Sequence, residues 1–200
     1  MKATTRALAT ASALGICRVA AAPSQAAQFA SATTSATVSV AAEVDVAAVT
    51  LGPWPVLRRG SNSVWPPVTV RSLQYLLNAR GASLAVDGVF GPATDAATRA
   101  FQRVNHLPVD GVVGDATWSR AIVTVRRGSS GPAVRAVQEQ INHRNLRGSG
   151  FLAVDGLFGS RTEAGVRGFQ TGMAFQLPFA VDGVVGPNTW KAFVIGWLAG

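Results

Sequence analysis

One string of short sequence words occurs twice in the second half of this chain, and the repeat limits what the chain can fold into. Each copy holds a Val-Asp-Gly segment ending in Phe-Gly, then Phe-Gln, then Val-Asp-Gly-Val-Val-Gly, then Thr-Trp. The separation of matching words grows by about one helical turn at two points, as expected when insertions fall in the loops of a repeated unit. The chain is therefore predicted to contain two copies of one small module, with no reactive residue shared between them.

The N-terminal residues 1–26 predict a secretory signal peptide. Two basic residues precede the apolar run 7–16, and small residues follow as far as Ala26. The apolar run is too short to span a bilayer, and Arg18 interrupts it. Cys17 raises the alternative of a lipid anchor, but the bulky residue before it does not suit that motif. We expect a protein that is secreted, extracellular or associated with the cell wall, without stable insertion into a membrane.

The rest of the chain divides into a spacer and two modules. Residues 27–53 consist mostly of Ala, Ser, Thr and Val, a composition that predicts a flexible spacer. Matched Arg-Arg-Gly-Ser lead-ins then introduce module 1 (54–123) and module 2 (124–200). Units of this size are near the lower limit for an independent core, so each module is expected to dock on its twin within a monomer.

The charge balance suggests an anionic partner. The chain has 18 basic and 10 acidic residues, a net charge of +8, and signal cleavage would remove only a few of the basic ones. Arginine supplies nearly all of the remaining positive charge, and its planar group suits bidentate contacts with anions. An anionic cell-wall polymer is a candidate, and the export signal favours it over nucleic acid. The alternative is that scattered arginines only keep the surface soluble.

Hydrophobic periodicity predicts three helices in each module, and hence an all-α fold of two tandem three-helix bundles. Val70, Leu73, Leu76 and Leu77 form the apolar stripe of the first helix. A second helix is expected from Gly91-Pro92 to Gln102, and a short third one around Trp118, with counterparts in module 2. Aromatic residues on these stripes are expected in the core: Phe90, Phe101, Trp118, Phe158, Phe169 and Trp190.

The ordered words resemble the peptidoglycan-binding domain of bacterial cell-wall hydrolases, over residues 57–197. The resemblance implies a three-helix, non-catalytic unit that holds its protein to peptidoglycan. Departures from the pattern between the copies are Ser160 in place of Pro92, Gly165 in the middle of a helix, and Asp115 in place of Pro187. These differences put equal affinity of the two copies in doubt, but not the fold.

The residues needed by known wall hydrolases are few in this chain. A zinc enzyme needs several converging His and carboxylate ligands, and the two histidines, His106 and His143, stand at non-matching places. A cysteine nucleophile is excluded once the single Cys17 is removed with the signal. Asp87, Asp110, Asp155 and Asp182 all precede Gly in turns, where an Asp side chain ordinarily caps backbone N–H groups. We therefore expect no enzyme activity, no metal and no cofactor.

Candidate ligand contacts lie in the Pro-rich lead-in and on the face of each first helix expected to be solvated. Trp65 is the aromatic residue expected to be exposed for stacking on a sugar. The polar groups of the two helix faces would suit a muropeptide carboxylate. Buried glutamines next to the core are expected to bond turn backbone instead of ligand. The candidate helix residues are Tyr75, Asn78, Arg80, Gln140, Asn142 and Arg144.

We interpret the chain as a secreted, non-catalytic protein that binds peptidoglycan through two linked modules, an arrangement that raises apparent affinity for a polymer. Two alternatives stay open. One is a targeting or regulatory subunit that uses the same fold to bind a partner protein. The other is a cell-wall hydrolase with an unrecognised active site.

Overall fold

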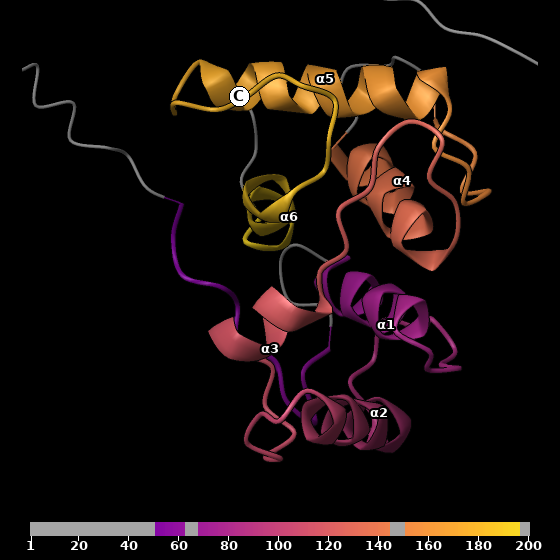
Figure 1. Cartoon of the computed structure of the whole chain (residues 1–200), viewed down its shortest axis with the longest axis vertical. Helices are drawn as coiled ribbons and strands as arrows, with labels where there is room; N and C mark the ends of the chain where they lie inside the picture. The colour runs from indigo at the N-terminus through magenta and orange to yellow at the C-terminus, as the bar shows by residue number, and fades with distance from the viewer. Residues whose placement is uncertain (1–50, 63–67, 145–150, 197–200) are drawn as a thin grey trace, which may run out of the picture. The chain divides into compact units, whose positions relative to one another are not determined.

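The computed structural model describes residues 51–62, 68–144 and 151–196, all within one compact unit, Val44–Gly200. The predicted signal peptide, nearly all of the predicted spacer and Trp65 lie outside these residues. The described residues form six helices (Figure 1), in chain order α1 Thr69–Ala79, α2 Pro92–Val104, α3 Asp115–Ala121, α4 Pro132–Arg144, α5 Ser160–Ala174 and α6 Pro187–Val194. Within these residues no helix is long and apolar enough to cross a membrane.

The helices form where the apolar periodicity places them, so the predicted all-α fold is confirmed. In α1 the stripe Val70, Leu73, Leu76 and Leu77 is at most 1% exposed. The six aromatic residues expected in the core are all buried. Helix α5 runs four residues past Gln170, which is the counterpart in module 2 of the end predicted at Gln102, because Met173 continues its buried face.

Each Asp-Gly turn is held by a buried glutamine from the helix before it and a threonine from the helix after it. At the first turn, the Gln74 side-chain N–H group donates to Asp87 Oδ1 at 2.7 Å and to the Val89 carbonyl at 3.1 Å, while Gly88 N–H donates to Gln74 Oε1 at 2.9 Å. Thr94 then donates to the same Val89 carbonyl. The prediction that these glutamines bond turn backbone is confirmed.

The same arrangement of glutamine, aspartate and threonine, here called the glutamine clamp, recurs at the other three turns with nearly the same distances. Its glutamine and aspartate members are Gln102 with Asp110, Gln138 with Asp155, and Gln170 with Asp182. Each aspartate also accepts a hydrogen bond from the backbone N–H two residues later, at 2.8 or 2.9 Å. The expected capping role of the four aspartates is therefore confirmed.

The lead-in of each module pairs with the second Asp-Gly turn of the same module. Leu57 and Val113 exchange two backbone hydrogen bonds of 3.1 and 2.8 Å, and Val125 pairs with Val185 in the same way. The indole N–H of Trp118 donates to the Pro55 carbonyl at 2.7 Å. The indole N–H of Trp190 donates in the same way to the Val123 carbonyl at 2.7 Å, next to the lead-in of module 2.

The two modules dock through α1 and α4 (Figure 1). Arg71 makes a bidentate ion pair with Glu139, at 2.6 and 2.7 Å, and the hydroxyl of Tyr75 donates to the same carboxylate at 2.9 Å. Burial and this hydrogen bond raise the pKa of Tyr75, which keeps its hydroxyl protonated as a donor. Gln140 is fully buried here and donates to the Ser72 hydroxyl at 2.7 Å.

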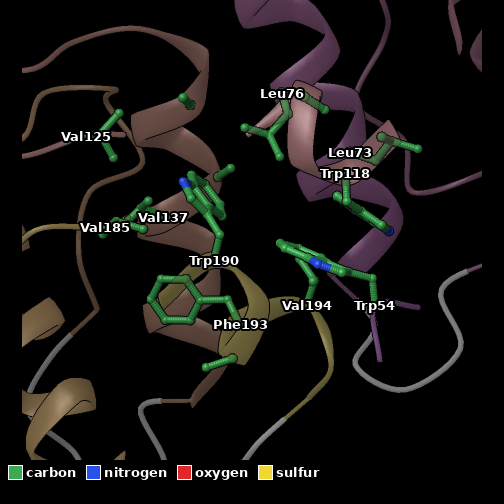
Figure 2. Packing of buried hydrophobic residues seen from close by; sticks show 14 of the residues in the cluster. Trp54, Leu73, Leu76, Trp118, Val125, Val137, Val185, Trp190, Phe193 and Val194 are labelled. Atoms are coloured by element: carbon green, nitrogen blue, oxygen red, sulfur yellow. The ribbon is translucent and has the colours of Figure 1, made fainter. Parts of the chain in front are cut away.

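A cation–π contact at Trp54 adds a second link between the modules. Trp54, from the lead-in of module 1, stacks on Trp118 with ring centroids 5.6 Å apart (Figure 2). The Lys191 ammonium of α6 lies 5.8 Å from the Trp54 ring. Residues from both modules therefore belong to one hydrophobic core.

Candidate functional site

An open groove lies in module 1, between the C-terminal end of α1, the loop 81–84 and the second half of α2. Its volume is about 490 Å³. Polar groups at its edge come from Arg80, Ser83 and Asn105. Its walls are mainly apolar and include Leu77, Leu84, Ala97, Ala100, Phe101 and Val104.

Arg80 supplies the charge of this groove. Its Nε donates to the Ala121 carbonyl at 3.2 Å and its Nη2 to the Ile122 carbonyl at 2.6 Å. These bonds hold the guanidinium at the end of α3, and the residue remains exposed. Of the seven residues predicted from sequence to contact a ligand, Arg80 is the one among the described lining residues of the groove.

Asn78 and Asn142 each hold a loop in place. The amide group of Asn78 donates to the Leu84 carbonyl at 2.9 Å and accepts from the Leu84 N–H at 2.7 Å. Asn142 makes the same pair of bonds to Leu152, at 2.8 and 2.7 Å. In module 1 the two hydrogen bonds from Asn78 fix Leu84 in the wall of the groove.

The structure places the remaining predicted helix contacts at the docking interface or next to it. Tyr75 bonds Glu139, and Gln140 is fully buried, so the expectation of a solvated helix face was wrong for Gln140. The physical reason is that α1 and α4 cover each other. Contact of these side chains with a ligand stays a prediction.

Arg144 matches Arg80 in the second module, but its surroundings differ. Both arginines donate to the carbonyl at the same place in the third helix, Ala121 for Arg80 and Phe193 for Arg144. The Arg144 guanidinium carbon lies 5.3 Å from the centre of the Phe193 ring and 5.6 Å from that of Phe169. Loss of solvation lowers the pKa of Arg144 to about 10, so it stays cationic at neutral pH.

Gly165 brings a second difference between the modules. A methyl group at Gly165 would meet Ile141 atoms at 3.0 and 3.3 Å and a Leu152 atom at 3.5 Å. Ile141 and Leu152 therefore pack directly against the backbone of α5. Module 1 has Ala97 at the matching position, and there the side chain lines the groove.

Sequence reasoning missed the walls of the groove. Ala97, Ala100 and Val104 are small apolar residues on a helix, and nothing in their chemistry marks a ligand site. A position-by-position comparison of the copies could have found them, since Gly165, Gly168 and Gly172 replace them in module 2. Val104, which lines the groove, is 78% exposed.

The turn aspartates have a pKa below their ordinary value of 3.8. For Asp87 the hydrogen bond from Gln74 is the largest cause, and for the other three it is the bond from a backbone N–H group. The four carboxylates are therefore tied into turns. Among the described residues, no group of three or more His, Cys, Asp or Glu side chains gathers as a metal site.

These shifts predict loss of stability in acid. A lowered folded-state pKa adds stability above the unfolded value of about 3.9, and this stability disappears as the pH falls through the folded pKa. Burial lowers the pKa of His143, so some stability is already lost as the pH falls below its ordinary value of 6.5. We expect the aspartates to add a further fall of the denaturant midpoint below about pH 4. Asp110→Asn, which keeps the accepting oxygen, should show a shallower fall. Equal acid dependence of the two proteins would contradict this assignment.

The comparisons with known proteins agree with the geometry. The family described as putative peptidoglycan binding domain matches residues 68–120 and 130–193, and this chain belongs to that family. It is 39% identical over 123 residues to the zinc D-Ala-D-Ala carboxypeptidase of Streptomyces albus G, a match that covers 60% of this chain and 43% of that protein. The chain thus spans less than half the length of that relative.

A solved structure also matches part of the chain. It is a fused Zn-dependent amidase/peptidase/peptidoglycan-binding domain-containing protein from Clostridium acetobutylicum ATCC 824, with 30% sequence identity. The match covers 50% of this chain and 46% of that one, with a TM-score of 0.33.

Proposed function

We propose that this chain is a secreted, non-catalytic protein that attaches to cell-wall peptidoglycan through its repeated modules. The observation that carries the proposal is the match of the peptidoglycan-binding family to two successive segments of the chain, residues 68–120 and 130–193. The groove beside Arg80 supports it, because it combines apolar walls with a cationic group, as ligand sites commonly do. The basic character of the chain supports attraction to an anionic wall polymer.

The contacts of the carboxylates support a binding role in preference to hydrolysis. Each of the four turn aspartates accepts a backbone N–H group and a glutamine N–H group in its own turn. Glu139 is occupied by Arg71 and Tyr75 at the docking interface. These groups have structural partners, whereas a general acid or base must face a substrate.

A targeting role through a partner protein is the second candidate. Phe151 and Phe175 in module 2 are 83% and 85% exposed, so their rings are accessible to a partner protein. Such a contact is compatible with wall binding by module 1. It would make this chain a targeting subunit for another protein at the wall.

The test is co-sedimentation with purified, insoluble peptidoglycan in which the wall carries a releasable dye. We expect the chain to sediment with the wall at low and at high salt, without dye release. Loss of sedimentation at high salt would reduce the function to adhesion between charged polymers, because salt screens such contacts. Dye release would overturn the non-catalytic proposal. A chain that stays in the supernatant at both salt concentrations would overturn wall binding itself.

A further inference from the structure

The two modules differ in the residues at the position of the groove, and this difference suggests that only one of them binds ligand. We propose that module 1 holds the ligand contact, that its groove takes a peptide segment with small side chains and a free carboxylate, and that Arg80 binds this carboxylate. Module 2 then acts mainly as the support on which module 1 is docked. This inference rests on the proposed function, because a wall stem peptide is the source of the ligand.

The groove walls fit small aliphatic side chains. Ala97 and Ala100 present only methyl groups along α2, and this leaves a volume of about 490 Å³ beside them. Leu77 and Phe101 close the inner side. A peptide with alanine-sized side chains can bury its methyl groups against these walls, whereas the hydroxyl-covered edges of a sugar chain would lose hydrogen bonds to water there.

Arg80 is placed to bind an anion at the edge of the groove. Its Nε and Nη2 are held by two carbonyl groups, which fix the plane of the guanidinium. Within the described part of the chain, its Nη1 has no protein acceptor. The described lining residues of the groove include no acidic side chain, so the local charge favours a carboxylate.

In module 2 the residues that match the groove wall and the surroundings of Arg80 are different. Phe193 takes the place of Ala121, and its ring lies over the Arg144 guanidinium. Gly165 takes the place of Ala97, which lets Ile141 and Leu152 pack against α5. The cation that matches Arg80 is therefore covered by aromatic rings, and the wall that matches Ala97 is occupied by protein atoms.

Ala100→Phe in the full chain tests the groove, and Gly168→Phe is the matched control. Ala100 is exposed and lines the groove, so a phenyl group there fills it without entering the core. Gly168 holds the matching position in α5, where an added Cβ has nothing within 4 Å. We expect Ala100→Phe to weaken binding to purified peptidoglycan about tenfold or more, and Gly168→Phe to change it less than about twofold. Equal binding of the two variants would overturn the assignment to module 1.

The ligand class is tested with acetyl-Ala-Ala-Ala carrying a free C-terminal carboxylate and with the same peptide as its C-terminal amide. We expect the acid to shift NMR signals of Arg80 and of residues 97–104, at a stoichiometry of one peptide per chain. The amide, and the acid added to Arg80→Gln, should produce shifts at least about fivefold weaker at equal concentration, as expected for loss of a charge-assisted hydrogen bond. Shifts at Arg144, or equal shifts by acid and amide, would overturn the proposal.

Removal of the stem peptides from the wall separates this inference from the proposed function. We expect the unmodified chain to bind intact peptidoglycan and to lose most binding to glycan strands freed of peptide. If glycan strands alone hold the chain equally well, wall binding stands and the peptide assignment falls. If the intact wall is not bound either, both fall.

Discussion

Gln102→Leu should lower the free energy of unfolding by about 2–4 kcal/mol, because each buried polar group left without a partner costs about 1–3 kcal/mol. Gln102 is 1% exposed and joins α2 to the turn that follows it. Its side chain donates to Asp110 and to the Val112 carbonyl, and its oxygen accepts the Gly111 N–H at 2.9 Å. Leucine has a similar volume, but it can neither donate nor accept these bonds.

The measurement is chemical denaturation followed by circular dichroism, with Gln176→Leu as the control. Gln176 is exposed just after α5, so its replacement should change stability by less than about 0.5 kcal/mol. A drop for Gln102→Leu no larger than that of the control would show that the glutamine clamp does not hold the turn. Because the glutamine clamp occurs four times, Gln170→Leu is expected to behave in the same way.

Phe193→Ala should produce an even larger loss, about 3–5 kcal/mol, which is the usual cost of removing a buried phenyl group. Phe193 is fully buried, with its ring centroid 4.5 Å from that of Phe169 and 6.2 Å from that of Trp190. Figure 2 shows Phe193 next to Trp190 in the packed interior. The substitution also uncovers Arg144.

Phe175→Ala is the matched control for this substitution, since Phe175 is 85% exposed. We expect little change in its thermal midpoint, whereas the midpoint of Phe193→Ala should fall by roughly 6–20 °C. A fall of less than about 2 °C for Phe193→Ala would mean that the ring contributes no core packing.

The helices and turns were predictable from the sequence because local signals determine them. Apolar spacing placed α1, and the Asp-Gly pairs placed the turns. The roles of Gln74 and Trp118 were also predicted correctly, because a glutamine beside a turn and an indole on an apolar stripe have one ordinary environment each. Local chemistry was sufficient for these residues.

The docking of α1 on α4 buries part of the polar helix faces, which the sequence pattern alone does not predict. Periodicity separates a polar face from an apolar one, but it does not say whether the polar face meets water or another helix. Gln140 illustrates this, because its partner Ser72 lies in the other module. The groove was missed for a different reason, since alanine side chains carry no chemical signal and only the space between elements makes them a site.

The shared core has a consequence for attempts to divide the chain into single modules. A fragment ending before α4 would lose Glu139, leaving Arg71 and Tyr75 without their common acceptor. It would also lose the α6 cation beside Trp54 and uncover apolar surface that the second module now protects. Such a fragment would tend to pair with other copies of itself. The number of binding sites per particle in a wall-binding assay would then result from this pairing and would not describe the intact protein. An affinity reagent based on this protein should therefore keep both modules, even if one of them never touches the wall.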